Sequence, residues 1–137
     1  MKTITVKQPW ASLMFIGESC KDVENRTWKT SVRGRVLIHA ASNPVSFHNP
    51  NQIFTQEQYD AIPDKIQSFC TKNSVIIGSV EIVDCVINHD SIWAEKTIGG
   101  EKPTYNWILA NPILFDKPIP AKGKLSFWDF NMESINK

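Results

Sequence analysis

Lys21, Glu24 and Arg26 bring an amine, a carboxylate and a guanidinium close together in the sequence, between two tryptophans, Trp10 and Trp28. Amine and guanidinium groups bind phosphate or carbonyl oxygen, a carboxylate accepts from an exocyclic amine, and an indole ring stacks on a base. These residue types predict a cleft for a nucleotide.

Further side chains join this cleft if three predicted strands, over 3–7, 22–28 and 35–40, are neighbours in one sheet. The main-chain amides that begin a predicted helix over 9–17 would attract an anion to the same place. The candidate ligand-binding residues are Lys7, Gln8, Pro9, Trp10, Ser12, Arg26, Trp28, His39 and Ser42.

Most of these residues also have a purely structural interpretation. Large aromatic residues usually serve burial, so Trp10 fits a core as well as a stacking platform, and Ser12 suits close helix packing. Glu24 and Arg26 can form a simple ion pair on one face of a strand. His39, at a strand end, can be a hydrogen-bonded core or rim residue.

Glu81 is a further candidate site residue, because it interrupts an otherwise apolar stretch, SVIIGSVEIVDCVI over 74–87. A carboxylate in such a strand must be paired, exposed on the outer face or functional. Alternation groups it with Ile77, Ser79 and Val83, so its face stays undecided.

The segments around these residues predict mainly short strands. TITVK over 3–7, RVLIHA over 35–40 and the stretch over 74–87 are rich in β-branched residues, and Gly78 predicts a bulge. Alternation over 22–28 puts Glu24, Arg26 and Trp28 on one face. Gly17 is a natural end for the helix that begins at Pro9.

The rest of the chain predicts loops, one helix and further strands. Residues 41–52 are loop-like, and a capping box formed by Thr55 and Gln58 opens a helix over 56–70, which Pro63 weakens. Residues 88–104 predict an irregular, mobile loop, and residues 105–130 two or three strands with proline-bearing connections. The fold class is α+β, a small curved or partly open β-barrel with helices capping its ends.

Length and composition are those of one domain, residues 1–137, with a hydrophobic fraction of 42% and a net charge of +1. The three cysteines and three histidines lack the spacing of a disulfide framework or a metal site, and nucleotide-loop and hydrolase motifs are absent, so neither metal nor cofactor is expected. No apolar run suits a signal peptide or a bilayer span, which predicts a soluble cytoplasmic protein without membrane contact. The oligomeric state stays open.

Five segments in order resemble the ASCH domain family of the PUA-like superfamily: VKQPWASLMFIGESCKDVENRTW, RGRVLIHAAS, IIGSVEIVDC, YNWIL and GKLSFWDF, between Lys7 and Phe130. The resemblance implies a curved β-barrel with helices at its ends and a cleft floored by the QPW segment and the strand with Glu24 and Arg26. It implies RNA as a partner. One branch of the family removes the acetyl group from N4-acetylcytidine with a lysine and a distant glutamate. Lys21 matches this lysine, Glu24 the motif glutamate and Arg26 the motif arginine, so the resemblance implies Lys21, Glu24 and Glu81 as candidate catalytic residues.

The sequence departs from that branch at the turn over 17–22, which contains Lys21. The turn is two residues longer than the family pattern and carries Asp22 where a threonine would lie. A carboxylate cannot replace a hydroxyl as the attacking group in the same way, and Ser19 or Cys20 would serve only if the turn folds back. The distant glutamate of that branch could be Glu81, Glu95 or Glu101.

Three functions therefore remain open. The first is a binding module for RNA or a modified nucleoside. The second is an amidohydrolase of an acylated nucleobase, or another nucleic-acid hydrolase, which ranks lower because Asp22 and Glu24 favour the charged, non-basic form of Lys21. The third is a protein-interaction domain that uses the apolar residues Ile92, Trp93 and Ile98 of the 88–104 loop.

Overall fold

The structure is a computed structural model that describes residues 1–16, 20–63 and 72–133. Its strands form one sheet in the order β2-β5-β4-β3-β1-β6, in which β1 and β3 are parallel and the other neighbours antiparallel. The elements are β1 (Lys2–Val6), α1 (Trp10–Leu13), β2 (Val23–Arg26), β3 (Gly34–Ala40), η1 (Pro50–Gln52), α2 (Gln56–Asp60), β4 (Val75–Val86), β5 (Tyr105–Pro120) and β6 (Phe127–Asp129).

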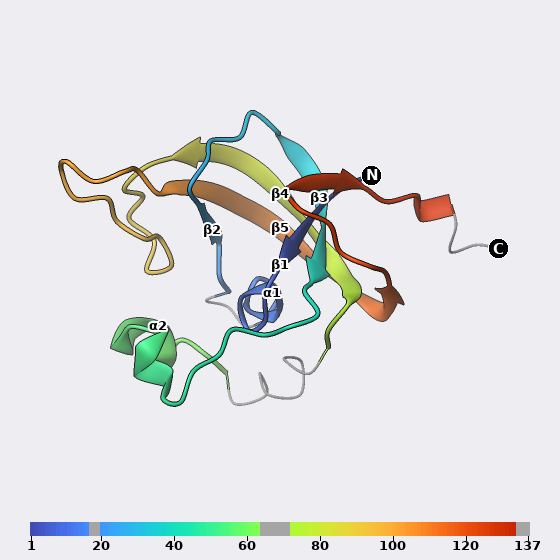
Figure 1. Cartoon of the computed structure of the whole chain (residues 1–137), viewed down its shortest axis with the longest axis horizontal. Helices are drawn as coiled ribbons and strands as arrows, with labels where there is room; N and C mark the ends of the chain where they lie inside the picture. The colour runs from blue at the N-terminus through green and yellow to red at the C-terminus, as the bar shows by residue number, and fades with distance from the viewer. Residues whose placement is uncertain (17–19, 64–71, 134–137) are drawn as a thin grey trace.

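The sheet curls into a partly open barrel, with the long strands β4 and β5 arching across it (Figure 1). The prediction of a curved sheet is confirmed, but the helices are minor. The helix expected over 9–17 is the single turn α1, and the part of the 56–70 helix that is described is the short α2. Gly17 and residues 64–70 lie outside the described residues. The fold is therefore mostly β, with the Thr55–Gln58 capping box present as predicted.

Gly78 marks the bend of β4. The register of β4 shifts against β5 between Ile76 and Gly78, and the facing strand β3 shifts between Ile38 and His39. A Cβ on Gly78 would lie 2.3 Å from the carbonyl oxygen of Ile113 and 2.7 Å from the Phe15 ring. Because Gly78 has no side chain, the backbone of β5 and the Phe15 ring can approach it closely. The bulge predicted at this glycine is therefore confirmed.

The strand β5 is one continuous element where the sequence predicts two or three strands. Its first residues, up to Ile108, pair with both β2 and β4, but the remainder pairs with β4 alone. That second part is an unpaired sheet edge, where a missing N–H costs little, so Pro112 and Pro118 are tolerated inside the strand. The prolines therefore mark an edge and not the ends of strands.

Aromatic side chains and one arginine draw the two ends of the sheet together. Trp107 of β5 is 1% exposed, stacks on Phe127 of β6 with ring centroids 5.3 Å apart, and meets Trp28 edge-on at 4.7 Å. Arg26 Nη2 donates to the carbonyl oxygen of Thr5 at 2.9 Å, which connects β2 to β1 across the open seam. The seam is the gap between the two ends of the curled sheet. Packing of Trp107 on Phe127 and the hydrogen bond from Arg26 to Thr5 both hold it together.

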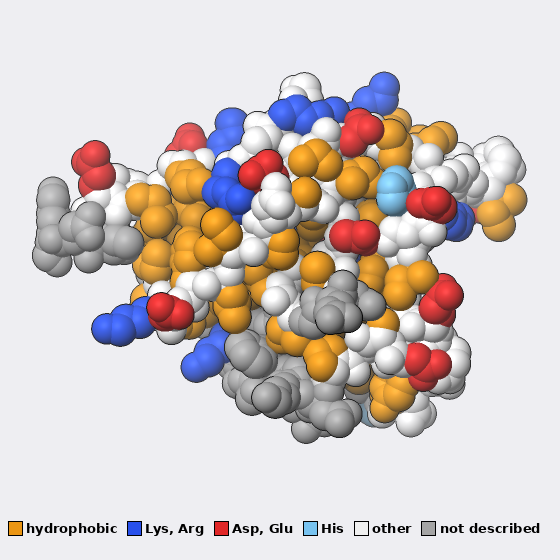
Figure 2. All heavy atoms as spheres, turned by 180° about the vertical axis from the view of Figure 1, so that it is seen from behind, with side chains coloured by type: hydrophobic (Ala, Val, Ile, Leu, Met, Phe, Trp, Pro, Cys, Tyr) orange, Lys and Arg blue, Asp and Glu red, His pale blue; other side chains and the backbone are white. Residues whose placement is uncertain are grey.

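The opposite face of the molecule shows hydrophobic side chains scattered between charged ones (Figure 2). Exposed apolar residues of the long strands include Val83, Ile113 and Leu114. No helix in the described part of the chain is long and apolar enough to cross a bilayer.

Candidate ligand-binding cleft

A cleft of about 1120 Å³ lies at the seam of the sheet. Its floor comes from the end of β1, the start of α1 and β2, and its walls come from the segments over 41–58, 92–104 and 124–126. Five of the candidate residues line it: Lys7, Trp10, Lys21, Glu24 and Arg26. The connections β3–β4 and β4–β5 thus enclose a site whose polar floor is carried by the sheet.

Glu24 lies between two cations on the floor. Its Oε1 atom is 3.3 Å from Lys21 Nζ, and its Oε2 atom accepts from Arg26 Nε at 2.8 Å and lies 2.7 Å from Arg26 Nη2. The side chains of Lys21 and Glu24 are 5% and 10% exposed. Lys21, Glu24 and Arg26 thus form one largely buried charged group, in which each side chain is paired with at least one of the others.

The cations of this group have further contacts that fix their positions. Lys21 Nζ also donates to the carbonyl oxygen of Val23 and lies 5.8 Å from the centroid of the Trp10 ring. The Arg26 guanidinium lies 5.8 Å from the Trp107 ring centroid. A buried ion group of this kind adds little net stability over apolar packing, because desolvating the charges offsets their attraction. Its position on the floor of the cleft instead favours a role in binding a ligand.

One wall of the cleft is aromatic. Trp10 is half-buried and meets Phe54 edge-on with ring centroids 5.2 Å apart, and Phe54 meets Trp93 at 6.4 Å. Trp93 is 3% exposed and packs with Leu13 and Val23 in a core cluster. The partly exposed rings of this wall therefore rest on a firm apolar base and can receive a flat apolar surface.

The 88–104 loop is irregular, as predicted, and it is anchored by two asparagines. Asn25 Nδ2 donates to the Trp93 carbonyl at 2.9 Å, and Asn25 Oδ1 accepts from the Glu95 amide at 3.0 Å. Asn106, fully buried, donates to Asn25 Oδ1 and to the Glu95 carbonyl, and accepts from the His89 amide. These bonds set the backbone of the loop that forms the second wall.

The apolar residues of this loop fold back in part. Trp93 is in the core, Ile92 is partly buried in the same cluster, and only Ile98, at 71%, is largely exposed. Gln58 Nε2 donates to the Ile92 carbonyl at 2.7 Å, which ties α2 to the loop. The predicted interaction surface is thus reduced to one of its three residues.

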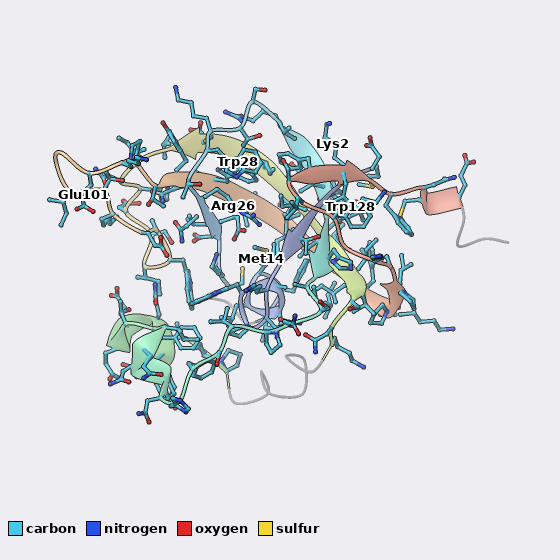
Figure 3. All side chains as sticks on the ribbon, in the orientation of Figure 1. Lys2, Met14, Arg26, Trp28, Glu101 and Trp128 are labelled. Carbon is cyan, nitrogen blue, oxygen red and sulfur yellow. The ribbon has the colours of Figure 1, made fainter. Side chains whose placement is uncertain are left out.

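The rim carries most of the remaining charge. In the described part of the chain, five basic and three acidic side chains line the cleft: Lys7, Lys21, Arg26, Lys96 and Lys124 against Glu24, Glu95 and Glu101. Figure 3 shows Arg26 directed between β2 and β1, and Glu101 far out on the 88–104 loop. The excess of positive charge favours an anionic ligand.

The structure places other candidate residues inside the protein. Gln8 is 1% exposed, accepts from the Ser12 amide and donates to the Lys72 carbonyl. Ser12 is 2% exposed, and Pro9 is buried beside it. Their contacts hold the β1–α1 junction, so they lie beneath the cleft floor and do not line it.

The predicted anion-attracting pole of the first helix is occupied by the protein itself. The amides of Ala11 and Leu13 donate to the carbonyls of Lys7 and Pro9, and the Ser12 amide donates to the Gln8 side chain. These three amides are therefore already hydrogen-bonded within the β1–α1 segment and do not face an anion in the cleft.

The remaining candidates lie elsewhere. His39 is 1% exposed, with Nε2 2.6 Å from the Ala121 carbonyl and its ring edge-on to Trp128, which matches its structural interpretation. Trp28 packs on the core beside Trp107, and Ser42 is exposed on the loop after β3. None of these three side chains is part of the cleft lining.

Glu81 is paired outside the cleft. Its Oε1 atom is 3.1 Å from Arg35 Nη2, and Arg35 also donates to Ser79 Oγ and to the Asn111 carbonyl. Of the three possible distant glutamates, Glu95 and Glu101 line the cleft and Glu81 does not.

Two groups beside Lys21 in the sequence, Cys20 and Asp22, bear on hydrolysis. Asp22 Oδ1 accepts from Ser91 Oγ at 2.5 Å, so the carboxylate at the family's threonine position is engaged with the loop. Burial raises the pKa of the Cys20 thiol, and the neighbouring Asp22 carboxylate raises it further. Cys20 is thus a poor source of a nucleophilic thiolate, and Ser19 lies outside the described residues.

Cys20 should be alkylated by iodoacetamide with a half-maximal rate at a pH above the ordinary value for a free cysteine, because the raised pKa lowers the thiolate fraction at any given pH. The measurement uses a Cys70→Ser/Cys85→Ser variant with glutathione as reference. Asp22→Asn should move the midpoint back down. A midpoint at or below that of glutathione would contradict this assignment.

Among the described residues, no three His, Cys, Asp or Glu side chains lie close enough to hold a metal ion.

The fold and the site together define a small, partly open β-barrel domain with a polar and aromatic cleft at its seam. The sequence model of the ASCH domain family matches residues 4–119, and the chain belongs to this family. It is 29% identical over 128 residues to "Activating signal cointegrator 1" of Homo sapiens and 28% identical to the Mus musculus protein of that name. Each alignment covers 91% of this chain but 21% of the relative, so the chain spans about a fifth of the length of these relatives.

Proposed function

We propose that the cleft binds RNA or a modified nucleoside. The observation that carries this proposal is the Lys21–Glu24–Arg26 group at the cleft floor, next to the Trp10 ring. Membership of the ASCH family and the excess of basic side chains around the cleft support it. A binding role explains why the fold keeps three charges in a place where apolar residues would pack at no loss of stability.

In this proposal each part of the cleft has its own task. The aromatic wall of Trp10 and Phe54 receives a base, since every base has an apolar face. Lys7 and Lys124 at the rim contact phosphates, while Arg26, 24% exposed, offers the outer side of its guanidinium to carbonyl or phosphate oxygen. Glu24 mainly fixes the two cations, because both of its oxygens already face them.

Lys7→Ala should weaken binding of a fluorescent oligouridylate of about ten nucleotides several-fold, and should reduce the slope of log K against log salt by about 0.7. Lys7 is exposed and lines the cleft, so its removal leaves the fold intact. Lys117→Ala is the matched control, since Lys117 is exposed on β5 and is not part of the cleft. Equal effects of both substitutions would place the RNA elsewhere, and absence of binding to oligonucleotides and nucleosides at low salt would refute the proposal.

The second candidate function is hydrolysis of an acylated nucleobase such as N4-acetylcytidine. Its specific support is that Glu95 and Glu101 line the same cleft as Lys21. Water would add to the acetyl carbonyl, the bond from carbon to N4 would break, and N4 would take a proton as acetate leaves. Hydrolysis ranks below binding because the Lys21 ammonium already donates to Glu24 and to the Val23 carbonyl.

Incubation with N4-acetylcytidine, followed by chromatography and mass analysis, tests this candidate directly. Release of cytidine by the natural protein and not by Lys21→Ala would establish the amidohydrolase. Turnover retained in Lys21→Ala would eliminate Lys21 from the mechanism.

A further inference from the structure

The strand β2 is the end of the sheet, so one of its edges has no neighbouring strand. In an antiparallel pair, both main-chain groups of a residue point to the partner at every second position. The Leu109 amide donates to the Asp22 carbonyl, and the register pairs Glu24 with Trp107. The main-chain groups of Glu24 therefore point to β5, and those of Val23 and Asn25 point to the free edge.

Only one donor–acceptor pair remains open at that edge. The Val23 carbonyl accepts from Lys21 Nζ, so it is in use. The main-chain N–H and C=O of Asn25 have no hydrogen-bond partner in the described part of the chain, and Asn25 lines the cleft. Asn25 is partly exposed where it lines the cleft, so these two groups are accessible to a ligand and can pair with it.

The Asn25 side chain holds this pair in place. It bonds the Trp93 carbonyl, the Glu95 amide and the Asn106 side chain, which fixes the strand against the loop. The neighbouring side chains Glu24 and Arg26 bond each other. The open N–H and C=O are therefore presented by a rigid segment, which lowers the entropy lost when a ligand binds.

We infer that the main chain of Asn25 reads the hydrogen-bonding edge of a nucleobase in the cleft, through its N–H and C=O together. This inference rests on the proposed function and names the part of the ligand that is recognised. The Watson–Crick edges of uracil, cytosine and adenine each carry a donor next to an acceptor, which complements one residue's N–H and C=O.

An extended peptide is a poorer fit for the same edge. Strand addition needs open main-chain groups at alternate residues along a strand. Here Val23 is fully buried and its carbonyl accepts from Lys21, and β2 ends at Arg26, so the accessible part of the edge is the single residue Asn25. Such an edge suits a small planar group.

The test follows the amide of Asn25 by ¹⁵N NMR while the full chain is titrated with oligouridylate, oligocytidylate or oligoadenylate of about ten nucleotides, whichever binds most tightly. We expect the Asn25 amide proton to shift downfield and its exchange with solvent to slow about tenfold or more on binding. The amides of Glu24 and Arg26 are internal controls, because they already face β5. Their exchange should change little.

A matched pair of ligands provides the second measurement. A methyl group on uracil N3 removes the donor at the recognised edge, while a methyl group on C5 lies away from it. The N3-methyl form of oligouridylate should bind about 5- to 150-fold more weakly than the C5-methyl form.

The outcomes separate the two proposals. Saturable binding that leaves the Asn25 amide unchanged, or equal affinity for the two methylated oligomers, overturns this inference and leaves the proposed function standing. Absence of binding to every oligonucleotide and nucleoside overturns both.

Discussion

Glu24→Ala should lower the free energy of unfolding by about 3–5 kcal/mol, because it leaves Lys21 and Arg26 as neighbouring cations without their shared carboxylate. Lys21 has almost no access to water that could replace the lost partner. Urea unfolding followed by tryptophan fluorescence measures the change. The folded fraction should also lose oligouridylate binding, since the positions of both cations depend on Glu24.

Two further variants serve as controls for the Glu24→Ala measurement. Asp116→Ala removes an exposed carboxylate from β5 and should stay within about 0.5 kcal/mol of the natural protein. Glu24→Gln keeps the shape of the side chain but not its charge, so it should fall between the two. A loss below about 1 kcal/mol for Glu24→Ala would show that water or another group takes over the role of the carboxylate.

Trp107→Ala should destabilise the protein by a similar amount, about 3–5 kcal/mol. The indole of Trp107 is buried against Trp28 and Phe127, and its Nε1 donates to the Trp28 carbonyl at 3.2 Å. Its removal leaves a cavity where the curled sheet closes on itself. Thermal unfolding by circular dichroism measures the loss.

A more conservative change at the same position separates packing from hydrogen bonding. Trp107→Phe keeps an aromatic ring but loses the Nε1 donor, so it should cost less than Trp107→Ala. Because Arg26 lies over the Trp107 ring, both variants should also weaken ligand binding. Unchanged stability in Trp107→Ala would contradict the role of this residue in closing the seam.

Local patterns were sufficient to predict most strands of the sheet. The strands observed at β1, β2, β3 and β4 match the predicted segments, and the bulge at Gly78 was visible as a glycine inside an apolar run. The long β5 was divided in the prediction because proline normally excludes a strand interior. Only the strand order, which leaves most of β5 unpaired on one side, removes that objection.

The floor of the cleft was predictable because its residues are close in sequence. Lys21, Glu24 and Arg26 lie on or beside one short strand, and alternation alone brings the last two together. Gln8 and His39 were grouped with them in the prediction, but the structure buries both outside the cleft lining, because a strongly curled sheet decides which polar side chains face inward. Alternation assigns side chains to the two faces of a strand, but it does not say which face becomes the inside of the curled sheet.

The walls were missed for a different reason. Phe54 and Leu125 come from connections, and their positions depend on contacts distant in sequence. An aromatic residue just before the Thr55 cap signals a local staple to the following helix. In the structure Phe54 instead packs between Trp10 and Trp93, a contact that no local pattern encodes.

The division between a sheet-borne floor and loop-borne walls has a consequence for how such a domain can diverge. Connections tolerate insertion and deletion far better than paired strands do, since few ladder hydrogen bonds depend on their length. Lengthening the β3–β4 or β4–β5 connection would reshape the cleft without moving Lys21, Glu24 or Arg26. One chemical floor can thus be offered to ligands of different size, and grafting of these two connections between relatives is a direct route to altered selectivity.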